Sequence, residues 1–498
     1  MSFIADALGV IFSLAGLAAL VAGTAIGIVV GALPGLGPSI GISLLIPFTY
    51  NMSPEISMLL LISLYMAAEY GGSVSAILLS TPGTAAAAAT TIDGFAMTQK
   101  GEANRALAIS LSASTVGGLV GGLALLFLAA PLSTLALQFG PASYFAVGLF
   151  GLTSVAALSG GSLIKGLLGA ALGLMLAFVG IDPISGFPRF TMGEVALFEG
   201  VPMLAALIGL FAVSEALLLA ENAMRERKKV GRGAVKSVML RLSDWKHMIG
   251  TMLQGSVIGT LLGILPGVGG NIACWVARDV AVRRNPGLKF GAGEGRGVAA
   301  PESANNATVG GAMVPLLSLG VPGSPTTAVI VGALVMHGLR PGPQLFTEQP
   351  VLVYSVLLGL LLSSIVMFIV GSLALPWLAR VVNLSDAVLA AGIIVFAILG
   401  AYALRNLQFD IWLTLGFGAL GYLMKKLSFP VAPVVLAMVL GYMVESNFRT
   451  ALVSSQGSYD IFITEPVSAV FLALSVLSIV LPLWRHVQRR KKTKTAQS

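Results

Sequence analysis

A proline-glycine interruption occurs twice in this chain, each time inside an apolar stretch long enough to cross a membrane. Leu33-Pro34-Gly35-Leu36-Gly37 returns 232 residues later as Leu265-Pro266-Gly267-Val268-Gly269. A second pair follows, because Ser80-Thr81-Pro82-Gly83-Thr84 is matched 240 residues later by Gly320-Val321-Pro322-Gly323-Ser324. A helix broken by proline survives in lipid only where protein or a watery cavity satisfies the freed backbone groups. Interruptions in corresponding halves indicate a duplicated membrane protein and mark the usual place of a solute-binding site.

The composition requires a membrane environment. Of the 498 residues, 56% are hydrophobic and only 10% are charged, whereas a soluble domain has about 25% charged residues. The mean hydropathy is +0.93. Long apolar runs without alternation exclude an outer-membrane barrel and predict an all-α polytopic membrane protein. Because one span needs about 20 apolar residues, we expect about 10–12 transmembrane helices in addition to re-entrant segments.

The net charge of +8 reflects membrane topology and not a nucleic-acid ligand, because the basic residues cluster beside apolar segments. They form a linker at 222–246 (Arg225, Arg227, Lys228, Lys229, Arg232, Lys236, Arg241 and Lys246) and a tail at 485–498 (Arg485, Arg489, Arg490, Lys491, Lys492 and Lys494). Loops rich in Lys and Arg stay in the cytoplasm. Residues 1–99 contain no Lys or Arg, so we expect the N-terminus outside.

These signals divide the chain into an N-terminal transmembrane repeat (1–221), a basic cytoplasmic linker (222–246), a C-terminal transmembrane repeat (247–484) and a basic cytoplasmic tail (485–498). With the N-terminus outside and the linker inside, the two repeats cross the bilayer in opposite senses, as inverted repeats do. A parallel duplication with the N-terminus inside is the alternative.

Small and hydroxyl residues surround the second interruption of each half. We expect two re-entrant hairpins with Pro82-Gly83 and Pro322-Gly323 at their tips, and with arms of about ten residues, half of a span. The alternative is a pair of kinked spanning helices packed through glycine.

Broken helices supply the groups that an anion and its accompanying cation require. Backbone N–H groups at a half-helix N-terminus attract anions, and unwound carbonyls or hydroxyls suit Na⁺. The candidate residues are Pro34, Gly35, Gly37, Ser39, Ser80, Thr81, Pro82, Gly83, Thr84, Pro266, Gly267, Gly269, Asn271, Pro322, Gly323, Ser324, Thr326 and Thr327. For any single Ser or Thr, helix packing or back-bonding to the preceding turn is the alternative.

Carboxylates inside the membrane are costly and therefore informative. Glu69, Asp93 and Glu302 fall in or beside the predicted hairpins, and Asn305 and Asn306 follow Glu302. A cation site or a proton relay is the functional interpretation. For Asp93, which lies near Lys100, an interfacial carboxylate paired with a base is an equal alternative.

Other functions lack their sequence motifs. No GxxxxGK[ST] or HExxH run occurs, and we expect neither an enzyme nor a cofactor. With three histidines and one cysteine, Cys274, a metal site is not expected. The run 291–297 is rich in glycine but matches no dinucleotide fingerprint and is interpreted as a flexible loop; Arg278 and Arg296 are expected to line a cytoplasmic loop.

The interrupted segments resemble the large membrane subunit of the bacterial tripartite tricarboxylate transporter family. The resemblance rests on Gly31-Ala32-Leu33-Pro34-Gly35-Leu36-Gly37-Pro38, Tyr70-Gly71-Gly72-Ser73, Ser80-Thr81-Pro82-Gly83, Ala300-Pro301-Glu302-Ser303-Ala304-Asn305-Asn306 and Gly320-Val321-Pro322-Gly323-Ser324, and it extends from about residue 8 to 484.

This resemblance implies the translocating component of a secondary transporter in the bacterial inner membrane. It also implies a small four-helix membrane subunit and a periplasmic solute-binding protein as partners, a carboxylate such as citrate as substrate, and a Na⁺ or H⁺ gradient as the driving force. From the residues alone, we expect alternating access around the four interruptions. A passive anion channel built from the same broken helices is the alternative.

Overall fold

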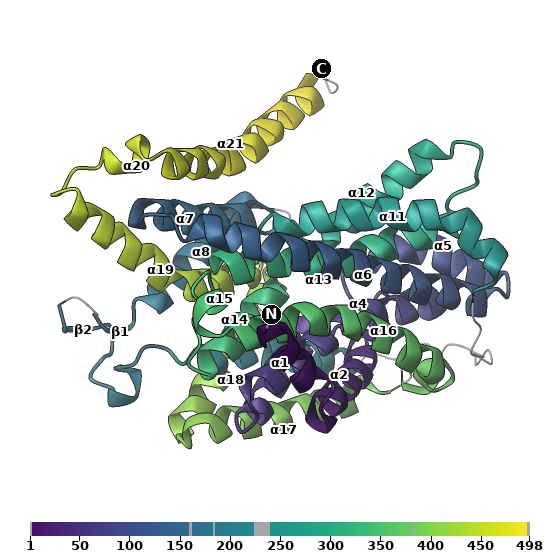
Figure 1. The fold of residues 1–498 in the computed structure, drawn as a ribbon, viewed down its shortest axis with the longest axis horizontal. Coiled ribbons are helices and arrows are strands. Elements are labelled where there is room, and N and C mark those ends of the chain that lie inside the picture. Colours follow the sequence, from purple (N-terminus) through teal and green to yellow (C-terminus); the bar gives the residue numbers. More distant parts are fainter. Residues whose placement is uncertain (1, 159–161, 183–184, 224–239, 382–383, 496–498) are drawn as a thin grey trace.

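The chain folds into a bundle of helices with one small two-stranded hairpin at its edge (Figure 1). This computed structural model describes residues 2–158, 162–182, 185–223, 240–381 and 384–495. Within these ranges, nine helices are long and apolar enough to cross a membrane. The predicted all-α polytopic fold is therefore confirmed. α13 and α19 are also long enough, at 24 and 23 residues, but polar side chains such as Glu302 and Glu445 lower their apolarity.

The elements of the first half are α1 (Ser2–Ile11), α2 (Leu14–Ala32), α3 (Pro38–Leu45), η1 (Ile46–Thr49), α4 (Pro54–Leu79), α5 (Ala88–Gln99), α6 (Ala103–Ala136), α7 (Pro141–Leu158), α8 (Leu163–Ala177), β1 (Gly180–Ile181), β2 (Pro188–Arg189), η2 (Val195–Leu197), α9 (Met203–Leu207), the π-helical η3 (Ile208–Val213) and α10 (Ser214–Ala223). β1 and β2 pair in antiparallel fashion, with Gly180 opposite Arg189.

The elements of the second half are α11 (Leu242–Ile264), α12 (Gly269–Arg284), α13 (Arg296–Leu319), α14 (Pro325–Met336), α15 (Leu345–Glu348), α16 (Pro350–Val381), α17 (Asp386–Arg405), α18 (Gln408–Lys426), α19 (Ala432–Ser454), α20 (Ile461–Thr464) and α21 (Pro466–Thr495). Of the predicted linker, residues 224–239 lie outside the described ranges. They include Arg225, Arg227, Lys228, Lys229, Arg232 and Lys236.

Each predicted interruption separates two helices, and local capping explains where they begin. The LPGxG runs lie between α2 and α3 and between α11 and α12, and the later Pro-Gly pairs follow α4 and α13. Ser53 caps α4 and is followed by Pro54, while Ser324 forms a capping box with Thr327 at the start of α14. The expected ten-residue arms are wrong for the first arm of each hairpin, because α4 and α13 are helices of 26 and 24 residues. Only the second arms, α5 and α14, are short, at 12 residues each.

Glycine seams bring the two helices beside each first interruption into close contact. In both halves, three glycines four residues apart lie against backbone carbonyls four residues apart: Gly23, Gly27 and Gly31 against Leu60, Leu64 and Ala68, and Gly255, Gly259 and Gly263 against Ala300, Ala304 and Thr308. The glycines of the two seams are 232 residues apart and the carbonyls 240, the same offsets as the interruptions. Since the partner number rises with the glycine number, α2 runs parallel to α4, and α11 runs parallel to α13.

The two parallel pairs meet at the buried centre, where α4 and α13 run in opposite directions. Asn305 Nδ2 donates to the carbonyl of Glu69 at 3.2 Å, and Asn306 Nδ2 donates to the carbonyl of Met66 at 2.9 Å. As the residue number increases along α13, the number of its contact residue on α4 decreases. The two halves therefore contribute their central helices in opposite senses.

Helices near the end of each half pack against helices of the other half. α19 packs against α7 and α8, while η3 and α10 pack against α17 and α18. Late helices of each half therefore cover helices of the other half.

We predict that Gly259→Ala lowers the free energy of unfolding by about 1–3 kcal/mol, because overpacking forces helices apart. A methyl group there would lie 2.7 Å from Ala304 Cα. Thermal unfolding of the detergent-purified protein measures the effect. Gly250→Ala is the control on the same helix, since no atom lies within 4 Å of a methyl group at that position. Equal midpoints for both variants would contradict the seam.

Candidate functional site

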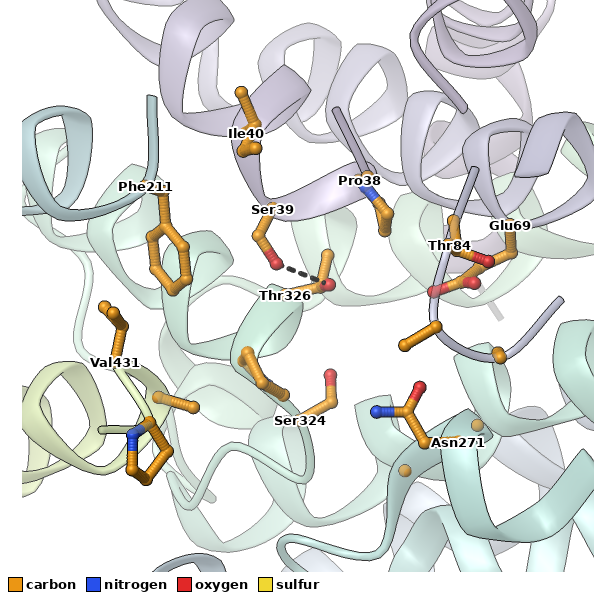
Figure 2. Close-up of a pocket in the computed structure, with 18 of the residues that line it drawn as sticks. Pro38, Ser39, Ile40, Glu69, Thr84, Phe211, Asn271, Ser324, Thr326 and Val431 are labelled. Carbon is orange, nitrogen blue, oxygen red and sulfur yellow. Dashed lines mark hydrogen bonds between the residues drawn. The ribbon is translucent and has the colours of Figure 1, made fainter. Parts of the chain in front are cut away.

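All four interruptions meet at one cavity of about 830 Å³ (Figure 2). The predicted residues that line it are Gly35, Gly37, Ser39, Glu69, Pro82, Gly83, Thr84, Gly267, Gly269, Asn271, Ser324 and Thr326. They come from both halves of the chain, and Figure 2 shows Ser39, Thr84, Asn271 and Ser324 around the open centre. The interruptions that match each other in the two halves of the sequence thus form the wall of one cavity.

The cavity wall contains the N-terminal ends of three helices. Residues of the first turns of α3, α12 and α14 line it. Gly35 before α3, Gly267 before α12 and Gly269 at the first position of α12 have φ angles of +92°, +84° and +55°. Such left-handed backbone favours glycine. The free N–H groups of a helix's first turn carry partial positive charge and attract anions.

Hydroxyl groups of the two halves form hydrogen bonds in the cavity wall. Ser39 Oγ lies 2.9 Å from Thr326 Oγ1, and Tyr65 Oη lies 3.1 Å from Ser324 Oγ. Behind these contacts, the residues Ala328, Val329 and Ile330 of α14 are fully buried. These hydroxyl pairs therefore join the two halves at the cavity.

The cavity also reaches residues near the end of α10, the helix that precedes the linker. Leu158, Lys425 and Phe429 line the cavity there. α10 ends just before the linker, and Lys426 forms an ion pair with Glu221 in the last turn of α10. The cavity therefore extends toward the linker side of the molecule.

A sequence profile described as the tripartite tricarboxylate transporter TctA family matches residues 17–436, which include every cavity residue. The chain belongs to this family. Two proteins of Agrobacterium vitis are similar to it. One, described as an uncharacterized 52.8 kDa protein in the TAR-I ttuC' 3'region, is 35% identical over 453 residues, which are 90% of this chain and 89% of that protein. The other, described as an uncharacterized protein in the TAR-II ttuC' 3'region, is 33% identical over 235 residues, 47% of this chain and 97% of that protein. No solved structure matches.

Membership of the TctA family makes the chain a membrane component of a tripartite transporter. It agrees with the expectation that the chain is not an enzyme. Gly37-Pro38-Ser39-Ile40-Gly41 has the G-x-S-x-G spacing of a hydrolase nucleophile, but that motif requires a strand-to-helix turn. Here it joins an interrupted helix to α3, and Ser39 contacts a threonine hydroxyl.

The remaining predicted residues of this TctA-family chain do not line the cavity. They are Pro34, Ser80, Thr81, Pro266, Pro322, Gly323 and Thr327, together with Asp93, Glu302, Asn305 and Asn306. Ser80 ends α4 with a φ of +56°, and Thr327 is held in the capping box of α14. Gly323 supports the wall, because its carbonyl accepts from the N–H of Gly267 at 3.1 Å.

Glu69 is the predicted carboxylate that reaches the cavity. Among the described residues, Glu69 Oε2 and Asn305 Oδ1 are buried and have no hydrogen-bond partner. The amide of Asn305 is anchored through its nitrogen to the carbonyl of Glu69. Oxygen acceptors left open in this way suit a hard cation or a proton.

Glu302 is fully buried in a cage of hydroxyl groups. It accepts hydrogen bonds from Thr90 at 2.5 Å, Ser110 at 2.9 Å and Ser114 at 3.1 Å. No ion pair to Glu302 is found in the described part of the chain. Hydroxyls stabilise either charge state of a carboxylate, because they can donate to it or accept from it.

The contacts of Asp93 indicate a structural role. It forms an ion pair with Arg278 at 2.8 Å and accepts from the backbone N–H groups of Gly291, Gly293 and Glu294 at 2.6, 3.2 and 3.1 Å. These contacts fit the alternative of a paired carboxylate, with Arg278 as the base in place of Lys100. They also hold the glycine-rich run, which the sequence suggested was a flexible loop.

Sequence reasoning missed several cavity residues of this TctA-family protein, namely Tyr65, Phe211, Glu215, Lys425 and Phe429. Phe211 lies in the π-helical η3, and Glu215 follows one turn later. Glu215 and Lys425 lie in α10 and α18, which contain no interruption, so no motif distinguished them. A charged residue one turn inside an apolar segment was the available signal for Glu215.

We predict that Asp93→Asn lowers the free energy of unfolding by about 3–5 kcal/mol, because it leaves Arg278 without its buried partner. Amide hydrogen exchange should also rise in residues 289–297. Asp279→Asn is the control, since its 2.9 Å pair with Arg283 is exposed and such pairs contribute about 0–1 kcal/mol. Unchanged stability and exchange in Asp93→Asn would contradict a structural role.

Proposed function

We propose that this chain is the translocating subunit of a secondary transporter that takes up tricarboxylates or dicarboxylates across the bacterial inner membrane. A small four-helix membrane subunit and a periplasmic solute-binding protein would complete the system. The observation that carries this proposal is the cavity at which both halves present their interrupted helices. Membership of the TctA family supports it.

Alternating access is the mechanism that this geometry supports. The cavity reaches toward the linker side, and the hydrogen-bonded pairs Ser39–Thr326 and Tyr65–Ser324 join the two halves in its wall. The opposite directions of α4 and α13 support the interpretation of the halves as inverted repeats. In such a protein, the two access states arise when one repeat exchanges its conformation with the other.

A cation gradient would drive this uptake. Bringing an anion to a wall that already contains Glu69 is costly unless a cation accompanies it. Glu69 Oε2 and Asn305 Oδ1 offer oxygen ligands for Na⁺, and Glu302 with its three hydroxyls offers a proton-carrying site. Both carboxylates are therefore assigned to coupling, with Na⁺ or H⁺ as the ion.

The test is accumulation of radiolabelled citrate, malate and succinate in proteoliposomes that contain the chain and its two partner proteins. A secondary transporter concentrates substrate, and an ionophore abolishes this concentration. A passive anion channel only equilibrates its substrate. Equilibration without accumulation would replace the proposed function by the channel.

We predict that Pro82→Ala reduces uptake about 10- to 100-fold, because a small displacement of a binding group has an effect of that size. The added N–H allows the first tip to continue as a helix. Pro131→Ala is the matched control, since Pro131 lies inside α6 and is exposed. Uptake by Pro82→Ala at the wild-type rate would remove this tip from the mechanism.

We predict that Glu69→Gln and Glu302→Gln abolish gradient-driven accumulation, because a neutral amide cannot bind the coupling cation as the carboxylate does. Exchange of labelled for unlabelled substrate should persist in at least one of them. Accumulation and exchange are measured in the same vesicles. Glu348→Gln should behave as wild type, because Glu348 is the exposed last residue of α15. Full accumulation in both variants would exclude these carboxylates from coupling.

A further inference from the structure

The cavity contains few full charges. Its ionisable lining residues in the described ranges are Tyr65, Glu69, Glu215 and Lys425. Two carboxylates therefore face one ammonium group. A substrate with two or three carboxylates meets a single full positive charge, in addition to the partial charges of the helix N-termini.

Lys425 is held by Glu215. Its Nζ lies 2.7 Å from Glu215 Oε2, and the two side chains are 24% and 15% exposed. Lys425 is in the last turn of α18, where the helix dipole favours a cation. The pair joins α10 of one half to α18 of the other at the linker side of the cavity.

Glu215 occupies the surroundings expected of a substrate carboxylate. Its Oε1 would lie 2.5 Å from a methyl group added to Gly35, so the carboxylate lies directly against the first interruption. It is therefore placed between the ammonium of Lys425 and the backbone that leads into α3. A carboxylate of the substrate would find the same ammonium and the same helix end.

We propose that Lys425 binds a carboxylate group of the substrate, and that Glu215 holds Lys425 in the empty cavity and is displaced when the substrate enters. This inference rests on the proposed function and identifies the basic residue of that site. Displacement exchanges one charge-assisted hydrogen bond for another, so the ammonium remains paired throughout. Release toward the linker side then follows when Glu215 pairs with Lys425 again.

The neighbouring residue provides an internal comparison. Lys426 pairs with Glu221, but these side chains are 42% and 33% exposed, and neither residue lines the cavity. The two ion pairs share residue types and join the same two helices, α10 and α18. They differ in access to the cavity, which is the property that the proposal requires.

The first experiment compares Lys425→Gln, Glu215→Gln and the double variant in citrate, malate and succinate uptake. Loss of a hydrogen bond to a charged group predicts a rise in KM of about 10- to 100-fold for Lys425→Gln. Glu215→Gln should keep or lower KM, because Lys425 no longer has a competing carboxylate. The double variant should resemble Lys425→Gln, and Lys426→Gln should resemble wild type.

A purely structural ion pair gives a different pattern. Removing either partner would then impair uptake equally, and the double variant would be no worse than either single one. That pattern overturns the proposal. Failure of the wild-type protein to take up any of the three probes contradicts the proposed function itself, so the two failures are distinguishable.

The second experiment tests whether uptake requires a positive charge at position 425. It compares two modifications of the same protein variant, so differences in folding between variants do not affect the result. Cys274 is the single cysteine of the chain, so Cys274→Ala allows Lys425→Cys to be modified selectively. An aminoethyl methanethiosulfonate reagent, which restores an ammonium group, should recover uptake, and a sulfonatoethyl reagent should not. The decisive background is Glu215→Gln, in which no ion pair can form. Recovery that persists there supports substrate binding; equal uptake with both reagents there overturns it. Lys426→Cys, treated in the same way, is the control.

Discussion

Backbone groups that are freed inside a membrane must find partners in protein or in enclosed water, and this constraint organises the molecule. Lipid supplies no hydrogen bonds, so an interrupted helix is stable only when it faces another part of the chain or a polar cavity. Here four interruptions satisfy the constraint together. The carbonyl of Gly323 accepts from the N–H of Gly267, the carbonyl of Gly72 accepts from the N–H of Gly83, and residues of all four interruptions line one cavity. The interruptions that create this backbone problem thus also form the wall of the cavity.

Close packing makes that arrangement possible. The glycine seams allow α2 to approach α4 and α11 to approach α13 at backbone distance, and small residues are the usual means by which helices associate in lipid. With those pairs fixed, Asn305 and Asn306 determine how α4 and α13 cross. The polar side chains of the centre therefore specify register, while the glycines supply proximity. Asp93 performs a similar task at the linker side by holding the loop before α13.

Much of the architecture could be predicted from the sequence because its signals are local. A proline followed by glycine inside an apolar run marks a break whatever the tertiary structure, so the four interruptions and the helical class followed directly. The full length of α4 and α13 was missed, since small and hydroxyl residues conceal a helix that is buried by protein and not by lipid. Lys425 and Glu215 were missed for a different reason. They form an ion pair between two helices that are distant in sequence. Neither helix contains a motif that predicts contact with the other.

The packing of α19 against helices of the first half has a consequence for biogenesis. α8 ends at Ala177 and its partner α19 begins at Ala432. At roughly 5–20 residues per second, synthesis of the intervening chain takes roughly 10–50 s. During that interval, α7 and α8 reside in the bilayer with the surface for α19 occupied only by lipid. The nascent first half therefore cannot complete its packing until α19 has been synthesised. Quality-control factors in the membrane can recognise it during that interval.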